Sequence, residues 1–348
     1  MIRRRLLGLE RRASPGIGEV GTHEGEAAEN WRRSPFYHLL QSGEAFMRRC
    51  FAAGAPADFP TVTELRDEGM SDYLAMVHRF AADGVIGEMD CVYSSWATDA
   101  PDGFDERGIA ALRELAPFLK LAIKSASLAR IAGTLVETYL GRDAGRRVLS
   151  GRIARGVADK IAAVLWYSDL RGYTRITDTA APEQIIPLLN DYADAVVSAI
   201  HGEGGDVLKL IGDGTLAIFK ADDPKHACRC ALDAATAMRR GVADLNRRRG
   251  QAGLPTTHVY LGLHVGEVFY GNVGSEDRLD FTVVGPAVNE ASRIAAMCRS
   301  AERDLLLSSA FAAAVGADER RRLVSVGRYA LRGVARPQEL FTLDPDMS

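Results

Sequence analysis

The most informative stretch of this chain is Trp166-Tyr167-Ser168-Asp169-Leu170-Arg171-Gly172-Tyr173-Thr174. The apolar run Ile161–Trp166 leads into it and predicts a buried strand. Asp169 follows that run, so its carboxylate is expected at the end of the strand, beside a loop that Gly172 loosens.

A second aspartate lies in a similar setting within Lys209-Leu210-Ile211-Gly212-Asp213-Gly214-Thr215-Leu216-Ala217-Ile218-Phe219. Asp-Gly between two apolar runs is a strong hairpin signal, because glycine accepts the positive φ of a tight turn. Asp213 is therefore expected at a hairpin tip. A hard cation such as Mg²⁺ takes one or two carboxylates together with substrate phosphates. Asp169 and Asp213 together predict a two-metal nucleotide site.

Composition sets the limits within which these motifs are interpreted. The chain has 348 residues, enough for two domains of about 150 residues each. Its hydrophobic content of 47% is ample for a core, and its net charge of −3 gives no general reason to expect nucleic acid or an anionic membrane as partner. The arginines close to the N-terminus are expected in a solvated tail.

The cysteines favour a reducing compartment. There are five of them, odd in number and scattered along the chain. Cys228 and Cys230 are two apart in a predicted helix and point to different faces, so a metal pair is not expected. No apolar stretch approaches the ~20 residues of a membrane span, and no continuous apolar segment follows the N-terminal arginines. We expect a cytoplasmic protein without a signal peptide.

The first half of the chain is predicted to regulate the second. Residues 1–30 are expected to be a disordered tail, 31–126 a small α+β domain, and 127–156 a helical linker. The domain resembles GAF-like sensor domains in its strand, Pro101-Asp102-Gly103-Phe104 turn and long final helix. A spacer that only promotes dimerisation is the alternative. The sequence does not identify the signal or ligand that a sensor would bind.

An apolar face is expected on the long helix of this first half. Leu112, Leu115, Leu119 and Ile123 recur at spacings of three and four. We expect this face to pair with its copy in a second chain. A second helical segment is predicted over Leu128–Tyr139, with Gly141 as its C-cap.

Strands and helices alternate through the second half, 157–348. Strands are predicted at 161–168, 206–211, 214–219, 257–269, 279–284, 305–308, 322–330 and 338–343. Helices are predicted at 182–202, 224–249 and 286–299. Adjacent hairpins with intervening helices indicate an α+β sheet.

Four motifs in order make a family resemblance specific. They are Ser168–Thr174, Lys209–Phe219, Gly262-Leu263-His264-Val265-Gly266, and Phe281-Thr282-Val283-Val284-Gly285-Pro286-Ala287-Val288-Asn289-Glu290-Ala291-Ser292-Arg293. From Trp166 to Leu343 the chain resembles the class III adenylyl/guanylyl cyclase catalytic domain. The resemblance implies a ferredoxin-like α+β catalytic domain.

The resemblance also assigns the metal and phosphate groups. Asp169 and Asp213 would bind two ions of Mg²⁺ or Mn²⁺, one at the ribose 3′-hydroxyl and one at the triphosphate. In-line attack on the α-phosphorus would expel pyrophosphate. The residues expected around the phosphates, chiefly through backbone amides at a helix start, are Leu170, Arg171, Gly172, Tyr173, Thr174 and Gly212.

Three further residues receive catalytic roles from the resemblance. Asn289 would orient the ribose, and Arg293 would stabilise the pentavalent phosphate through a guanidinium that stays protonated. These two lie four apart in a predicted helix and share a face. Arg332, in Leu331-Arg332-Gly333, replaces the lysine that contacts phosphates in the family, with Arg336 as the alternative.

Two positions would read the base. In the family, lysine at the position of Lys209 is associated with ATP, and threonine at the position of Thr282 occurs in a bacterial subgroup. Lysine can donate to adenine N1, and a threonine hydroxyl can accept from the 6-amino group. ATP is therefore favoured. A hydroxyl can also donate, so a guanylate or mixed-specificity cyclase is the alternative, and a nucleotide-binding regulatory module without turnover is a third reading.

The geometry of one strand predicts a dimer. Lys209 and Asp213 are separated by four residues of extended chain, about 13 Å at ~3.3 Å per residue, so they are poorly placed to serve one nucleotide. The family solution is a homodimer with shared sites, in which Asp169 and Asp213 of one subunit face the base and ribose residues of the other.

Overall fold

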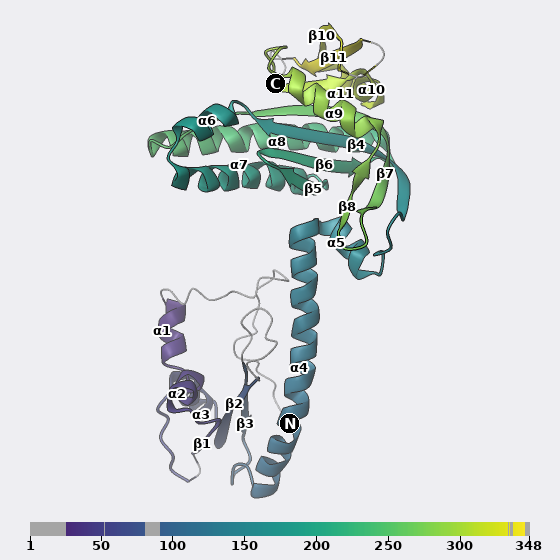
Figure 1. The fold of residues 1–348 in the computed structure, drawn as a ribbon. Helices are drawn as coiled ribbons and strands as arrows, with labels where there is room; N and C mark the ends of the chain where they lie inside the picture. The colour runs from purple at the N-terminus through teal and green to yellow at the C-terminus, as the bar shows by residue number, and fades with distance from the viewer. Residues whose placement is uncertain (1–25, 52, 81–90, 333, 335–336, 345–348) are drawn as a thin grey trace. The chain divides into compact units, whose positions relative to one another are not determined.

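The computed structural model describes residues 26–51, 53–80, 91–332, 334 and 337–344 (Figure 1). The chain divides into two compact units, one up to Leu135 and one from Val136. This boundary falls inside the segment 127–156 that the sequence assigns to a linker. Among the described residues, no helix combines the length and the apolar character that a bilayer span needs.

The first unit is a small sheet with helices. Its elements are α1 (Glu26–Arg32), α2 (Pro35–Ser42), β1 (Phe46–Cys50), α3 (Pro60–Asp67), β2 (Asp72–Arg79), β3 (Cys91–Thr98) and most of α4 (Glu106–Leu140). The strands are antiparallel in the order β1-β2-β3. Of the predicted tail, residues 1–25 lie outside the described residues, whereas 26–30 belong to α1. The likeness to a GAF domain stays a prediction.

The helix α4 differs from expectation in two ways. It is one helix rather than two, because nothing around Ser127 interrupts it. In addition, Ile109 and Ala116 are buried, and Leu112, Leu119 and Ile123 on the same side are half-buried. Of the four residues predicted to pair with a second copy, only Leu115 is exposed, and the pairing itself stays a prediction. The exposed apolar side chains are Leu115, Phe118, Leu121, Leu135 and Tyr139.

The reason for this orientation lies in the contacts of α4 with β1 and β2. The Arg113 guanidinium lies 4.5 Å from the centre of the Phe46 ring. The Lys120 ammonium donates to the Arg79 carbonyl oxygen at 2.5 Å. These contacts turn the side of α4 that holds Ile109 and Ala116 toward the small sheet.

The second unit contains the large sheet. Its elements are α5 (Arg142–Leu149), β4 (Ala158–Leu170), α6 (Tyr173–Thr179), α7 (Pro182–Gly202), β5 (Asp206–Ile211), β6 (Gly214–Lys220), α8 (Pro224–Gln251), β7 (Val259–Gly274), β8 (Leu279–Val284), α9 (Pro286–Met297), β9 (Leu305–Ser308), α10 (Ser309–Ala314), α11 (Ala317–Arg321), β10 (Leu323–Tyr329) and β11 (Gln338–Leu343). The strand order is β10-β11-β9-β7-β4-β6-β5, and β8 pairs with the distal half of β7. The pairings are antiparallel except β7 with β9. The α+β prediction is confirmed.

Both faces of the sheet are covered, which explains the continuous apolar run in β4. Val164 and Trp166 face a core shared with α7 and α8. Leu165, between them, faces a second core shared with α5 and α9. Alternate residues of a strand point to opposite faces, so a strand covered on both sides is apolar throughout. Asp169 is the penultimate residue of this strand.

The β5–β6 hairpin presents Asp213 as expected, although with a different glycine at the turn. Ile211 pairs with Gly214, which leaves Gly212 and Asp213 as the loop residues. The positive φ of 62° is at Gly212, and Gly214 is the first residue of β6. A two-residue hairpin loop often requires a positive φ at its first position, which a glycine accepts without strain. The tip of the hairpin therefore depends on Gly212.

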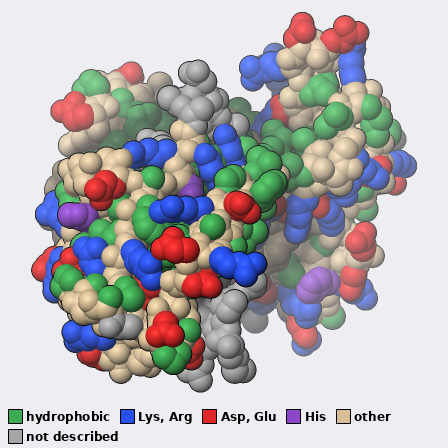
Figure 2. All heavy atoms as spheres, turned by 90° about the horizontal axis from the view of Figure 1, so that it is seen from below, with side chains coloured by type: hydrophobic (Ala, Val, Ile, Leu, Met, Phe, Trp, Pro, Cys, Tyr) green, Lys and Arg blue, Asp and Glu red, His purple; other side chains and the backbone are tan. Residues whose placement is uncertain are grey.

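Surface charge is mixed on the face that Figure 2 shows. Side chains of both signs are interspersed among the described residues of that face, in keeping with a net charge of −3. Basic side chains do not gather there into the continuous stripe that nucleic-acid binding proteins display.

Close packing of α9 on β7 gives a stability prediction. A Cβ at Gly262 would lie 2.5 Å from the Ala295 nitrogen and 2.7 Å from the Ala291 carbonyl oxygen, both backbone atoms of α9. We expect Gly262→Ala to destabilise the protein by about 1–3 kcal/mol or more, because the helix must move away from the sheet. Urea denaturation followed by circular dichroism measures this change.

The matched control is Gly241→Ala in α8. A Cβ there meets only the Ala195 methyl group, at 3.8 Å. Replacing a helical glycine with alanine should leave stability unchanged or raise it by about 0.5–1 kcal/mol. Equal urea midpoints for the two variants would contradict the close approach of α9 to β7.

Candidate active site

Two carboxylates meet where β4 ends and the β5–β6 hairpin turns. The Asp213 Oδ2 atom accepts a hydrogen bond from the Leu170 amide at 3.3 Å, which fixes the hairpin tip beside Asp169. Loss of hydration at the crowded strand end, together with the adjacent Asp213 carboxylate, raises the pKa of Asp169 to about 6. Two like charges held together in this way favour either a proton or a cation between them.

The donor set suits a hard divalent cation. Both ligands are carboxylates on ordered backbone, which Mg²⁺ and Mn²⁺ accept. In the described part of the chain, no group of three or more acidic, histidine or cysteine side chains is arranged to hold a metal ion. The pair would therefore leave coordination positions for waters and phosphate oxygens, as Mg²⁺ sites in nucleotide enzymes do. Asp169 and Asp213 are the residues that would hold the ions.

The loop after β4 offers fewer amides than the sequence indicates. The Leu170 amide already donates to Asp213, and the Arg171 amide donates to the His258 carbonyl oxygen at 2.8 Å. The expectation that all five residues from Leu170 to Thr174 give amides to phosphates was therefore wrong for these first two. Gly172, Tyr173 and Thr174 lie at the start of α6, where amides have no partner within the helix.

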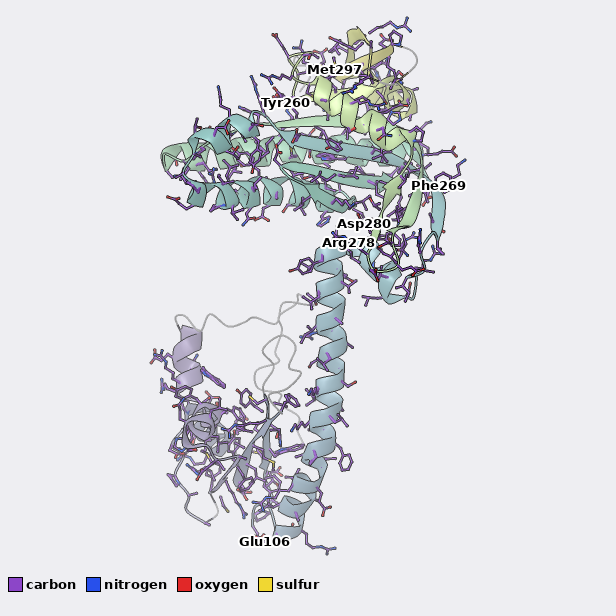
Figure 3. All side chains as sticks on the ribbon, in the orientation of Figure 1. Glu106, Tyr260, Phe269, Arg278, Asp280 and Met297 are labelled. Carbon is purple, nitrogen blue, oxygen red and sulfur yellow. The ribbon has the colours of Figure 1, made fainter. Side chains whose placement is uncertain are left out.

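The two residues predicted to read the base lie on β5 and β8. Lys209 forms an ion pair with Asp280 of β8. Thr282 lies two residues further along β8, on the same face of the strand, and is buried. Figure 3 labels Asp280 on this strand. The structure thus places the Lys209 ammonium beside the strand that carries Thr282.

Asp280 is a residue that the sequence reasoning missed. The sequence did indicate that Asp280 shares a strand face with Thr282, because the two are two residues apart on a predicted strand. Its pairing with Lys209 could not be foreseen, since that depends on how β8 folds toward β5. The carboxylate neutralises the lysine and restricts its position. An uncompensated lysine would be a freer and more strongly hydrated donor.

The two residues of the catalytic helix lie where the sequence predicts. The helix α9 starts after Gly285 with Pro286 in its first turn, and its buried side is formed by Ala287, Ala291 and Ile294. Asn289 is exposed and Arg293 half-buried. Arg293 forms no ion pair with any residue that the structure describes. Its guanidinium is available to a phosphate.

The late arginine is placed only in part. Arg332 is exposed in the segment between β10 and β11, and Arg336 lies outside the described residues. The neighbouring Leu331 packs with Ile294 of α9 in a small core that also contains Leu340. The segment with Arg332 is therefore packed against the helix that carries Asn289 and Arg293.

A family model for the adenylate and guanylate cyclase catalytic domain matches residues 158–344, just over half of the chain. The chain belongs to this family. It is 37% identical over 157 residues to an adenylate cyclase of Anabaena cylindrica, covering 44% of this chain and 30% of the relative. It is 28% identical over 181 residues to adenylate cyclase 1 of Rhizobium meliloti, covering 50% and 27%. The chain thus spans about 30% of the length of these curated relatives.

A solved structure supports the same fold. A bacterial light-regulated adenylyl cyclase aligns with a TM-score of 0.55 at 21% identity, covering 66% of this chain and 65% of that one. The family description includes both nucleotides, so membership identifies a class III nucleotide cyclase domain and leaves the base open.

The carboxylate pair gives a prediction that needs no turnover. Asp169 has a folded pKa of about 6, above the usual value of an aspartate near 3.9, so protonation favours the folded state and stability falls as pH rises between these values. Without metal, Asp169→Asn should therefore have a higher Tm than wild type at pH 7.5, and no such advantage at pH 4. Thermal unfolding at the two pH values measures this.

To bind, Mn²⁺ must displace the proton from the Asp169 carboxyl. The rise in Tm that Mn²⁺ gives the wild type should therefore weaken as pH falls through about 6, and it should be absent in Asp169→Asn. Asp178→Asn, an exposed acid in α6, is the matched control and should behave as wild type. An unchanged Mn²⁺ response in Asp169→Asn would show that this carboxylate is not a metal ligand.

Proposed function

We propose that this chain is an adenylate cyclase that converts ATP to 3′,5′-cyclic AMP and pyrophosphate. The observation that carries the proposal is the pairing of Asp169 with Asp213 in a chain of the cyclase family. The base and ribose positions, Lys209, Thr282 and Asn289, are all present on ordered elements of the same unit. A catalytically silent module would need none of these groups together.

The reaction joins the ribose 3′-oxygen to the α-phosphorus and breaks the bond from that phosphorus to the oxygen bridging to the β-phosphate. Asp169 and Asp213 are the proposed metal ligands and would hold divalent cations, which when bound would lower the pKa of the 3′-hydroxyl and neutralise the triphosphate. Asn289 orients the ribose. Arg293 donates to the equatorial oxygens as negative charge grows on them, which a fixed guanidinium does without changing its own protonation. Arg332 is assigned to the phosphates.

ATP is the proposed nucleotide because of the groups beside Lys209. The Lys209 ammonium donates to adenine N1, and the Thr282 hydroxyl accepts from the 6-amino group. The ion pair with Asp280 supports this assignment, since it holds the ammonium at β8, the strand that also carries Thr282. A guanylate or mixed-specificity cyclase is the alternative, because a hydroxyl can also donate to a 6-oxo group.

The active form is proposed to be a homodimer with two shared sites. Lys209 lies on β5, and Asp213 lies in the hairpin turn that follows this strand; four residues of extended chain span about 13 Å at ~3.3 Å per residue. A nucleotide that reaches Asp213 of one subunit would therefore use Lys209 and Thr282 of the other. Two identical subunits related by a two-fold axis complete two such sites.

The first unit is proposed to regulate the second. The helix α4 passes from one unit into the other, and its exposed Phe118 and Leu121 give it an apolar surface on which two copies can pair. A change in that pairing would alter how two catalytic units meet. The few, scattered cysteines, five in number, are the basis for the proposed location in a reducing cytoplasm.

Shared sites give the test of this proposal. Asp169→Ala and Asn289→Ala should each be nearly inactive in ATP cyclisation, yet mixing them should restore activity, because a mixed dimer retains one site with every group intact. With random exchange half of the dimers are mixed and each has one of two sites, so about a quarter of the wild-type rate is expected. Cyclic AMP formation by chromatography measures it.

The control is a mixture of Asp169→Ala with Asp213→Ala. Both changes affect the same half-site, so neither site of that mixed dimer is intact and activity should stay low. Recovery in the control, or none in the first mixture despite demonstrated subunit exchange, would contradict shared sites.

Base selection gives a second prediction. Lys209→Glu with Thr282→Cys should raise the GTP-to-ATP ratio of kcat/KM by about tenfold or more, because a carboxylate accepts from guanine N1–H and the 2-amino group. Glu at 209 would face the Asp280 carboxylate, so Asp280→Asn accompanies the change. An unchanged ratio in a variant that still shows Mn²⁺ stabilisation would remove these positions from base recognition.

A further inference from the structure

Glu290 is an acidic residue on the sheet-facing side of the catalytic helix. It follows Asn289 directly and lies three residues after Ala287 and four before Ile294, both buried. Its side chain is 22% exposed. A carboxylate in such a position costs free energy unless it is hydrogen-bonded, so its partners indicate why it is tolerated there.

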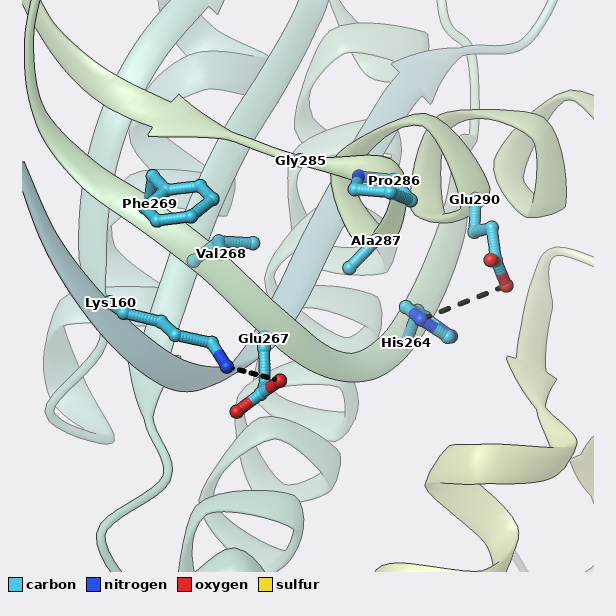
Figure 4. Close-up of a pocket in the computed structure, with 9 residues that line it drawn as sticks. All are labelled: Lys160, His264, Glu267, Val268, Phe269, Gly285, Pro286, Ala287 and Glu290. Atoms are coloured by element: carbon cyan, nitrogen blue, oxygen red, sulfur yellow. Dashed lines mark ion pairs between the residues drawn. The ribbon is translucent and has the colours of Figure 1, made fainter.

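The carboxylate of Glu290 has partners on two strands. Its Oε2 atom accepts a hydrogen bond from the Gln338 Nε2 atom of β11 at 3.0 Å. The same oxygen lies 3.8 Å from the Nε2 atom of His264 in β7 (Figure 4). His264 is buried and anchored in turn, because its Nδ1 atom lies 2.9 Å from the hydroxyl of Ser308 in β9.

These contacts connect the two segments that carry the proposed phosphate-binding arginines. Asn289 and Arg293 belong to α9, and Gln338 begins β11 directly after the segment that contains Arg332. The same two segments also share apolar contacts through Ile294 and Leu331. Apolar contacts set the distance between a helix and its neighbours but are not directional, whereas a hydrogen bond to a carboxylate fixes direction.

We propose that Glu290 is a positioning residue that orients α9, and with it Asn289 and Arg293, by its hydrogen bond to Gln338 of β11 and its contact with buried His264 of β7. This rests on the proposed function, since Asn289 and Arg293 act on the nucleotide only in a cyclase. Glu290 itself does not contact substrate. Its effect is on the rate of the step that those two residues assist.

The test exchanges the two hydrogen-bonding groups. Gln338→Glu places a second carboxylate against Glu290, and Glu290→Ala removes the acceptor. Both variants should lower kcat by roughly 10- to 100-fold with little change in KM for ATP. The reason is that a misplaced Asn289 or Arg293 mainly loses contacts with the transition state. Glu290→Gln combined with Gln338→Glu restores a donor–acceptor pair in the reverse direction, and its kcat should recover.

The control is Glu267→Gln, in a pocket that His264 and Glu290 also line. Glu267 pairs with Lys160 at 2.9 Å on the exposed rim, and exposed pairs contribute little. Its kcat, KM and Tm should match wild type. The assays are run well below the Tm of every variant, so that a loss of folded protein does not lower the measured kcat.

A second measurement is independent of turnover. Amide hydrogen exchange in α9 and at the start of β11 should rise together in Glu290→Ala and Gln338→Glu, and return in the exchanged pair. The positioning role would be overturned if the single variants kept the hydrogen exchange and kcat of the wild type, or if only their KM changed. It would also be overturned if the double variant Glu290→Gln with Gln338→Glu failed to recover. A wild type that makes no cyclic AMP, yet shows the expected exchange pattern, would instead contradict the proposed function.

Discussion

The account depends on the repulsion between two carboxylates that the backbone brings together. Asp169 is placed by β4, which lies between β7 and β6 in the large sheet, and Asp213 by a two-residue turn at Gly212. The pKa of Asp169 rises to about 6 because hydration is lost and the charge of Asp213 is adjacent. Such a pair lowers the stability of the free protein at neutral pH, and a cation removes that cost when it binds. The proposed function gives this local electrostatic strain a role.

The remaining groups of the site are each held by a contact outside the nucleotide pocket. Asp280 restrains Lys209, and Gln338 and His264 lie against Glu290, beside Asn289. Each of these contacts is polar and directional, whereas the cores beneath them are apolar. A site that depends on placement of charge benefits from such supports, since an error of about 1 Å can cost 10²-fold in rate.

Much of the catalytic fold follows from the sequence, because its signals are local. The continuous apolar run Ile161–Trp166 marks a strand covered on both faces, and α7 begins and ends at the predicted residues, 182 and 202. The proposed site residues Asp169, Asp213, Asn289 and Arg293 were predicted from ordered motifs that are read locally in the sequence. The base-reading role of Lys209 was predicted in the same way and stays a prediction.

What the sequence did not show depends on contacts between distant segments. The segment 127–156 was predicted as a helical linker, but its division into the end of α4 and a separate short helix α5 was not; ion pairs from Asp143 to Lys220 and from Arg147 to Asp159 hold α5 on the sheet. The partial burial of Leu112, Leu119 and Ile123 on α4 was not foreseen, since apolar spacing does not tell which stripe of a helix the same chain covers. The hydrogen bond from the Leu170 amide to Asp213 joins residues that are 43 positions apart in the sequence, so no local pattern could indicate it.

The most direct test of the central claim is identification of the products that the purified chain forms from ATP with Mn²⁺. The account predicts 3′,5′-cyclic AMP and pyrophosphate in equal amounts, formed faster than cyclic GMP from GTP under the same conditions. Release of ADP or AMP without cyclic nucleotide, or faster formation of cyclic GMP from GTP, would contradict it.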